Sequence, residues 1–356
     1  MTSNARLLRC GCAILPPEML RRIAARGTAQ QRDAALGTLA MDQTMRLARA
    51  TQQLLEAGGH RPLLGVPIPA KQRTVYDAQN RELLPGQTVR AEGSAAIADV
   101  QANEAYDGLG ATFDFFADVY DRNSIDDAGL HLDATVHYGR QYDNAFWNGR
   151  QMVFGDGDGD LFNRFTISLD VIAHELAHGV TGSEAGLVYL GQAGALNESV
   201  SDVFGSLVKQ YVRNETAARA DWLIGEGLFT ANVHGVALRS MKAPGTAFDD
   251  PVLGRDPQPA TMAGYVRTSA DNGGVHTNSG IPNHAFYLTA IALGGHAWEK
   301  AGRIWYETLR DKRLKPAATF REFARYTVDN ADRGFGAAER RAVADAWNAV
   351  GIKAAS

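Results

Sequence analysis

The chain has 356 residues, of which 45% are hydrophobic and 21% charged, and its formal net charge is -4. These values are typical of a globular protein large enough for two domains, and no basic stretch interleaved with aromatic residues indicates a nucleic-acid partner. No apolar run approaches the ~20 residues that a membrane-spanning helix requires.

Residues 1–60 are predicted to form a separate N-terminal piece. Its first part has only one apolar run, Ala13-Ile14-Leu15, which is too short for the core of a secretory signal. A Pro-Pro-x-x-Leu element at residues 16–20 precedes a helical pattern at residues 30–55. Residues 56–71 are rich in glycine and proline, which predicts a linker.

In the remainder of the chain, the predicted secondary structure changes near the middle from mainly β-strands to mainly helices. Short β-type runs alternate with turns around a single helix, and the expected elements are strands at 73–76, 87–90, 132–138 and 151–154 and a helix at 102–121. From Leu196 onward the pattern is almost wholly helical, with helices expected at 283–293, 298–311, 319–329 and 338–350. We therefore predict an α+β fold of two domains, with a substrate cleft at the domain interface.

The run His174-Glu175-Leu176-Ala177-His178 carries the strongest chemical signal. Apolar residues at helical spacing around it predict a largely buried helix of about three turns. Residues four apart share one helix face, so the two imidazoles point the same way and suit a zinc ion. Glu175 is then well placed to take a proton from water activated by the metal.

A catalytic zinc site usually has a third protein ligand. The best candidate is Glu198, in a second helical pattern where Asp202 lies one turn further along the same face. Asp202 can then accept a hydrogen bond from the free N–H of a ligand histidine. Two alternatives to zinc binding stay open. The histidines and Glu175 could form a structural ion-pair cluster, and Glu198 with Asp202 could lie on a solvated helix face.

Several further motifs, all in one order, resemble those of the thermolysin family of zinc metalloendopeptidases. The resemblance runs from about Tyr142 to the C-terminus and is densest between Asn144 and Gly205. Besides the two segments above, the motifs are Asn144-Ala145-Phe146-Trp147-Asn148-Gly149, Gly155-Asp156-Gly157-Asp158-Gly159, Ala185-Gly186-Leu187-Val188-Tyr189, Leu238-Arg239-Ser240-Met241 and residues 271–280 from Asp271 to Gly280. The resemblance implies a two-domain fold whose zinc helix lies at the cleft between a β-rich and a helical half.

The resemblance also implies which residues bind the metal. His174, His178 and Glu198 would bind one zinc ion, and Glu175 would be the general base. The reaction would be hydrolysis of a peptide bond without a covalent intermediate, and nothing in the chain suggests a serine or cysteine nucleophile.

By the same resemblance, Tyr189 and His276 would donate hydrogen bonds to the oxyanion, and Asp271 would orient His276. Such donors make chemical sense, because losing one from an oxyanion site commonly costs ~10²–10³ in rate. Taken alone, residues 271–280 equally fit a glycine-rich loop with an incidental histidine.

The substrate backbone would be held by Asn144 and Arg239, and the carbonyl of Ala145 would accept from the substrate or the leaving amine. The pocket for the side chain after the cut would be lined by Phe162, Phe165, Val171, Ile224, Leu228 and Leu238. Since all six are apolar, we expect Leu, Phe, Ile or Val at that substrate position. The alternative for each is an ordinary core residue.

Family members that bind paired calcium ions beside the zinc helix gather several carboxylates there. This chain keeps Asp170, Asp221 and Glu226, but Lys209 and Leu223 stand where two more acids are expected. Calcium needs six to eight oxygen ligands, and an ammonium supplies none. We expect the paired calcium site to be lost and the Lys209 ammonium to replace a cation; the alternative is a lysine that points to solvent.

The N-terminal piece resembles the short propeptide of the protealysin-like subgroup. We expect a zymogen in which removal of the first fifty to seventy residues exposes the cleft, so that the propeptide is an inhibitor; the alternative is a helical subdomain that stays attached. Family habit predicts secretion, although the sequence shows no signal peptide, which leaves leaderless export or an intracellular enzyme open. Cys10 and Cys12 are expected to be inert thiols rather than a thiolate cap on the zinc.

The predicted domains are a propeptide at 1–60, a β-rich catalytic domain at 70–190 and a helical catalytic domain at 191–356. The predicted function is that of a monomeric neutral zinc endopeptidase acting on proteins. One alternative is a zinc aminopeptidase, which needs acids to grip a free amine, and another is a catalytically inactive peptide-binding protein of the same fold.

Overall fold

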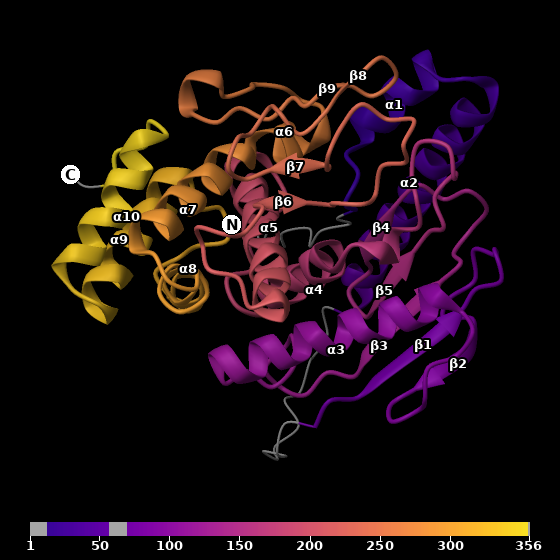
Figure 1. Cartoon of the computed structure of the whole chain (residues 1–356), viewed down its shortest axis with the longest axis horizontal. Helices are drawn as coiled ribbons and strands as arrows, with labels where there is room; N and C mark the ends of the chain where they lie inside the picture. Colours follow the sequence, from indigo (N-terminus) through magenta and orange to yellow (C-terminus); the bar gives the residue numbers. More distant parts are fainter. Residues whose placement is uncertain (1–12, 57–69, 355–356) are drawn as a thin grey trace.

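The computed structural model describes residues 13–56 and 70–354 (Figure 1). Two N-terminal helices, α1 (Pro17–Arg26) and α2 (Ala29–Glu56), pack against each other. They lie beside β4 (Ala145–Trp147) and apart from the helices of the C-terminal half (Figure 1). Cys10 and Cys12 and most of the predicted linker lie outside the described residues.

The β-rich half is built on a five-stranded sheet. Its strands are β1 (Arg73–Asp77), β2 (Gln87–Ala91), β3 (Leu132–Val136), β4 and β5 (Gln151–Phe154), in the order β2-β1-β3-β5-β4. β1, β3 and β5 run parallel, and the outer strands β2 and β4 pair antiparallel with β1 and β5. β4 is therefore an edge strand, and an edge strand can bind an extended peptide.

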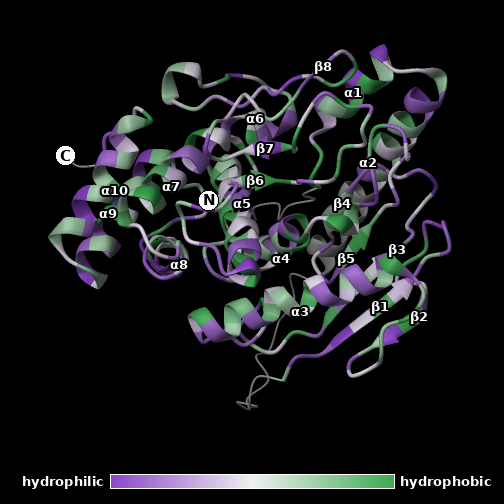
Figure 2. Ribbon diagram, in the orientation of Figure 1, coloured by the Kyte–Doolittle hydropathy of each residue, from purple (hydrophilic) through white to green (hydrophobic). Residues whose placement is uncertain are grey.

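The long helix α3 (Val100–Tyr120) covers this sheet (Figure 1). The carboxylate of Asp99 caps its N-terminus by accepting from the backbone N–H groups of Gln101 and Ala102. Hydrophobic and hydrophilic residues alternate along α3 (Figure 2), as expected for a helix with one face on a core.

The centre of the molecule is formed by α4 (Leu169–Ser183) and α5 (Gly191–Arg213), which pack along each other. Apolar side chains of both helices are fully buried. The two backbones approach closely at Gly205, where a Cβ would lie 2.5 Å from the carbonyl oxygen of Asp170. A glycine is needed there for the close crossing, which brings the polar face of α5 against that of α4.

The C-terminal half is a group of helices: α6 (Asp271–Asn278), α7 (Gly280–Leu293), α8 (Ala301–Arg310), α9 (Phe320–Gly334) and α10 (Ala337–Ala349). Two-residue strands β6 (Leu223–Ile224), β7 (Arg239–Ser240), β8 (Asp249–Asp250) and β9 (Gly254–Arg255) and two short 3₁₀ turns, η1 (Phe165–Ile167) and η2 (Met262–Gly264), complete the elements.

The predicted α+β fold with a β-rich and a helical half is confirmed, but one part of it is wrong. Residues 214–270 are not helical, since they form loops around β6 to β9 and one 3₁₀ turn. The physical reason is that this stretch is interrupted by glycines and prolines, which do not sustain a helix. Within residues 13–56 and 70–354, no helix combines the length and the apolar character that a bilayer crossing requires.

Candidate metal centre and substrate cleft

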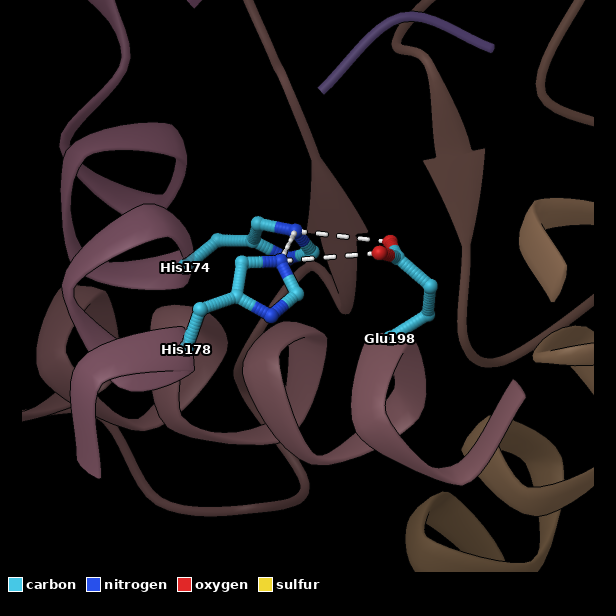
Figure 3. A group of neighbouring side chains, drawn as sticks. All are labelled: His174, His178 and Glu198. Carbon is cyan, nitrogen blue, oxygen red and sulfur yellow. Dashed lines mark hydrogen bonds and ion pairs between the residues drawn. The ribbon is translucent and has the colours of Figure 1, made fainter. Parts of the chain in front are cut away.

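Three side chains from two helices converge at the centre of the molecule (Figure 3). The Nε2 atoms of His174 and His178, both on α4, lie 3.1 Å apart. The carboxylate of Glu198, on α5, lies 3.5 Å from each of these nitrogens, with Oε2 nearer His174 and Oε1 nearer His178. All three residues are buried.

The other nitrogen of each imidazole has an oxygen neighbour. Nδ1 of His174 lies 2.8 Å from Oδ1 of Asp202, and Nδ1 of His178 lies 2.8 Å from the amide oxygen of Asn197. With the proton on Nδ1, each imidazole is neutral and presents a lone pair at Nε2, which is the form that binds a metal. Two lone pairs and a carboxylate that face one another at this distance suit a cation between them, and this donor set is one that zinc prefers.

The charge of Glu198 is maintained by its neighbours. Burial alone would raise the pKa of this carboxyl, but the charged imidazole of His276, together with His174 and His178 when these are protonated in the absence of a metal, holds the pKa well below its usual range. The hydroxyl of Tyr189 also donates a hydrogen bond to Glu198 Oε1. The carboxyl is therefore ionised and able to bind a metal at neutral pH.

Glu175 lies on the same helix between the two histidines and is fully buried. Its Oε2 accepts from the backbone N–H of Trp147 at 3.0 Å, and its Oε1 has no hydrogen-bond partner among the described residues. Burial raises the pKa of Glu175 to about 8, and a divalent cation beside it would lower that value again. The arrangement is suited to a group that takes up and returns a proton.

His276 faces the same centre from the other side. Its Nδ1 lies 2.8 Å from Oδ1 of Asp271, and its Nε2 lies 3.2 Å from the hydroxyl of Tyr189 and 3.5 Å from Glu198 Oε2. Burial would lower the pKa of His276, but Asp271 and Glu198 outweigh it and raise the pKa to about 9. The imidazole is therefore charged at neutral pH, with an N–H donor directed into the cleft.

The groups predicted to hold a substrate backbone are occupied by the N-terminal segment Ala13–Leu15. Ala13 pairs antiparallel with Phe146 of the edge strand β4. The carbonyl of Ala13 lies 3.1 Å from His276 Nε2. The segment therefore lies at the edge of the metal centre, because the same nitrogen lies 3.5 Å from Glu198 Oε2.

The next two residues bind the remaining groups of the cleft. The N–H of Ile14 donates to the carbonyl of Ala145 at 3.0 Å, and the Ile14 carbonyl accepts from Arg239 Nη1 at 3.2 Å. The N–H of Leu15 donates to Asn144 Oδ1 at 2.9 Å. Asn144, Ala145 and Arg239 thus all bind one extended peptide.

Helix α2 holds the same wall of the cleft. The buried carboxylate of Asp42 accepts from the hydroxyl of Tyr142 at 2.5 Å and from Asn144 Nδ2 at 3.0 Å. The hydroxyl of Thr38 accepts from the backbone N–H of Asp143 at 2.9 Å. The N-terminal piece is therefore anchored at points other than the segment in the cleft.

The predicted pocket residues Phe162, Val171 and Leu238 are buried. They belong to one hydrophobic cluster that also includes Ile14, whose side chain is fully buried. Phe165, Ile224 and Leu228, which were also predicted to line the pocket, are fully buried in the same cluster.

Lys209 is buried among acids and does not point to solvent. Its Nζ lies 2.8 Å from Asp170 Oδ2 and 2.9 Å from Asp221 Oδ1, and it donates to the carbonyl of Leu223 at 2.7 Å. Burial would lower the pKa of Lys209, but Asp170 and Asp221 outweigh it and raise the pKa. Glu226 is paired with Arg213 instead.

Several supporting residues were missed by the sequence analysis. Asn197 and Ser201 both approach His178 Nδ1, at 2.8 and 3.0 Å. They lie one turn apart on α5, each directly before a predicted acid, so the helical spacing alone could have identified them. Asn283, which donates to Asp202 Oδ2 at 2.8 Å, and Asp42 come from distant segments and have no such signal.

Asp202 also contacts Arg239, which was predicted only as a substrate-binding residue. Nη2 of Arg239 lies 2.8 Å from Asp202 Oδ1 and its Nε lies 2.9 Å from Oδ2. One carboxylate therefore orients both a metal-facing imidazole and a guanidinium of the cleft.

Comparisons with known proteins agree with this geometry. The family described as thermolysin metallopeptidase, catalytic domain matches residues 50–182, and its alpha-helical domain matches residues 185–352. An extracellular metalloprotease of Pectobacterium carotovorum subsp. carotovorum is 54% identical over 344 residues, which cover 96% of each chain. Protease PrtS of Photorhabdus sp. (strain Az29) is 48% identical over 96% of this chain and 92% of its own.

A solved structure is similar over almost the whole length. The precursor of protealysin, a metalloproteinase from Serratia proteamaculans, is 56% identical, with a TM-score of 0.87, over 96% of this chain and 99% of that chain. The chain therefore belongs to the thermolysin family of zinc metallopeptidases, within its protealysin-like subgroup.

Proposed function

We propose that this zinc metallopeptidase is an endopeptidase that cuts proteins before hydrophobic residues and is held inactive by its own N-terminal piece. One observation carries the proposal. Two imidazole lone pairs and a carboxylate converge beside Glu175, and an extended peptide of the chain itself lies across them, bound through its backbone.

Glu175 is the proposed general base. A zinc ion held by His174, His178 and Glu198 would polarise the scissile carbonyl and make water more acidic. Glu175 then takes the proton from the attacking water through its Oε1 and passes it to the departing amine. The buried position of Glu175 excludes bulk water from this proton.

His276 and Tyr189 are the proposed oxyanion donors. The charged imidazole of His276, held by Asp271, directs an N–H at the position that the carbonyl oxygen of Ala13 occupies. Such a donor stabilises negative charge more strongly in a buried site than in water. The hydroxyl of Tyr189 lies 3.2 Å from the same nitrogen; here it donates to Glu198, and it would turn to serve the same oxygen when zinc holds Glu198.

Backbone binding and side-chain preference are assigned to different groups. We propose that Asn144, Ala145 and Arg239 hold any substrate through its backbone, as they hold Ile14 and Leu15. The preference for a hydrophobic residue after the cut is assigned to the pocket that includes Phe162, Val171 and Leu238, because burying an apolar side chain is favourable by roughly 1.5–3 kcal/mol.

The N-terminal piece is the proposed inhibitor. Segment 13–15 covers the groups that a substrate needs, and Asp42 binds the amide of Asn144 from the other side. We propose boundaries of 1–60 for this propeptide, 70–190 for the β-rich catalytic domain and 191–356 for the helical one. Removal of the propeptide would free the cleft without disturbing α4 or α5.

Three further properties are part of the proposal. The Lys209 ammonium takes the place of a cation, so that the paired calcium site near Asp170, Asp221 and Glu226 is lost. The enzyme acts as a monomer. It works outside the cell, as the names of two relatives, an extracellular metalloprotease and an extracellular minor metalloprotease of Serratia marcescens, support.

The proposal is tested by digestion of casein and of an amino-blocked peptide with Phe or Leu in its middle, with and without a zinc chelator. Cleavage of the blocked peptide before the apolar residue, abolished by the chelator and restored by zinc, is the expected result. An aminopeptidase would cut only the version with a free amine, and an inactive binding protein would cut neither.

A further inference from the structure

Segment 13–15 enters the cleft in a defined direction. The carbonyl oxygen of Ala13 lies 3.1 Å from His276 Nε2, and the same nitrogen lies 3.2 Å from Tyr189 and 3.5 Å from Glu198. Ala13 therefore presents its carbonyl to the oxyanion donors at the edge of the metal centre. The carbonyl that meets these donors is the one whose carbon would be attacked.

The nitrogen that leaves in such a reaction belongs to the following residue, Ile14. Its N–H donates to the carbonyl of Ala145 at 3.0 Å, as a leaving amine would. Its own carbonyl accepts from Arg239, and the N–H of Leu15 donates to Asn144, so both residues after the bond are held through their backbones. A peptide shifted along the cleft by one residue would not place a carbonyl at His276, the next N–H at Ala145 and the next carbonyl at Arg239.

The side chains agree with the backbone. Ile14 is the first residue after the bond, and its β-branched apolar side chain is fully buried in the main hydrophobic core, to which the pocket residues Phe162, Val171 and Leu238 also belong. A hydrophobic residue at this position is what the proposed specificity requires. Ala13 is small and places no bulk before the bond.

We propose that the Ala13–Ile14 peptide bond is an internal substrate of this enzyme and is the first bond that the chain cuts in itself. This proposal rests on the proposed endopeptidase function. Water adds to the carbonyl carbon of Ala13, the bond from that carbon to the Ile14 nitrogen breaks, and Glu175 carries a proton from the water to the leaving nitrogen. The products are an N-terminal peptide that ends in the carboxylate of Ala13 and a chain that begins with the amine of Ile14.

The cut does not by itself release the inhibitor. Asp42 still binds Tyr142 and Asn144, and Thr38 still accepts from the backbone of Asp143. Residues 14–56 therefore stay docked after the cut, while the contact between Ala13 and His276 is free to dissociate. The cut is a first step that loosens the inhibitor before its removal.

The experiment follows the N-terminus of the full-length protein in time by intact mass and N-terminal sequencing after denaturation. In the wild type we expect a species that begins at Ile14 to form before any other, with a rate that is independent of protein concentration because the reaction is intramolecular. Glu175→Gln should retain Met1. The Ile14→Asp variant, which places a charge in the apolar pocket, should form this species at least tenfold more slowly, whereas a matched Leu83→Asp change at an exposed leucine should not.

A second measurement is independent of turnover. In the uncut Glu175→Gln protein, hydrogen exchange should show protected amides at Ile14 and Leu15, because both donate hydrogen bonds in the cleft. The Ile14→Asp change should remove this protection. A wild type that digests casein but keeps the Ala13–Ile14 bond while another bond is cut first, or unprotected amides in Glu175→Gln, would overturn the inference. A chain that digests no casein at all would instead overturn the proposed function.

Discussion

Removing the ammonium of Lys209 tests the account of the ion cluster between α5 and β6. In a Lys209→Ala variant the fully buried carboxylate of Asp170 loses its charged partner at 2.8 Å. Its Oδ1 keeps two neutral donors, the hydroxyl of Ser168 at 2.8 Å and the N–H of Gly225 at 2.9 Å. Breaking a buried ion pair from one side costs about 3–5 kcal/mol, and because these donors remain we expect the lower end.

A loss of about 3 kcal/mol would lower the melting temperature by several degrees, since one kcal/mol corresponds to about 2–4 °C even in domains somewhat smaller than this chain. The assay is thermal unfolding followed by circular dichroism, in a Glu175→Gln background that prevents autolysis. Lys242→Ala, at an exposed lysine, is the matched control.

Calcium gives a second measurement on the same variant. Without the ammonium, the carboxylates of Asp170 and Asp221 and the carbonyl of Leu223 are available to a cation. With a weak dissociation constant of about 1 mM, 10 mM calcium would restore about 1.4 kcal/mol to the variant and nothing to the wild type. A Lys209→Ala protein that melts within one degree of the Lys242→Ala control would show that the Lys209 ammonium does not stabilise the buried Asp170 carboxylate.

Three further predictions concern the cleft. Burial and the charge of Asp158 raise the pKa of Asp143 to about 8. Between about pH 4 and pH 8 the folded protein therefore keeps a proton on Asp143 that the unfolded chain has released. The free energy of unfolding of the wild type falls as the pH rises through this range. The Asp143→Asn variant lacks this pH dependence. Its free energy of unfolding minus that of the wild type, measured by urea unfolding, should therefore increase from pH 5 to pH 8 by at most about 4 kcal/mol. An equal difference at both pH values would contradict this. His276→Ala should lower kcat by ~10²–10³ with unchanged zinc content, and a variant that keeps wild-type kcat would remove His276 from the oxyanion site. Asp42→Asn weakens a charged hydrogen bond to Asn144 and should shorten the lag before casein digestion about tenfold or more, whereas an unchanged lag would show that Asp42 does not hold the inhibitor.

The parts that could be predicted from the sequence are those governed by local periodicity. His174, Glu175 and His178 on one helix, and Glu198 with Asp202 on the next, follow from residues four apart sharing a face. The strands at 73–77, 87–91 and 151–154 were visible as short β-type runs between turns.

The parts that could not be predicted depend on contacts between distant segments. Asp42 meets Asn144 across more than a hundred residues, and Asn283 meets Asp202 across 81. No local sequence pattern predicts such pairs, because they form only when α2 or α7 packs against the rest of the fold. The chain from Leu196 onward was predicted to be almost wholly helical, and this is wrong for residues 214–270, whose glycines and prolines interrupt a helix and whose loops are held by tertiary hydrogen bonds.

The same limit applies to the segment in the cleft. The sequence shows the Pro-Pro-x-x-Leu element, but the three residues before it, Ala13–Leu15, are the ones that contact His276, Ala145 and Asn144, to which we assign roles in catalysis and substrate binding. Their sequence is too short to form a periodic pattern. Only the position of β4 at the edge of the sheet shows that an extended peptide binds there.

The central claim is that His174, His178 and Glu198 hold one zinc ion whose chemistry depends on the carboxylate of Glu175. The most direct test compares wild type with Glu175→Gln, measuring zinc per chain by atomic absorption and casein digestion in the same samples. We expect about one zinc per chain in both proteins and a loss of activity of at least about a thousandfold in the variant, with no gross change in melting temperature. A wild type that digests casein without bound metal, or a Glu175→Gln protein that digests it at the wild-type rate, would contradict the account.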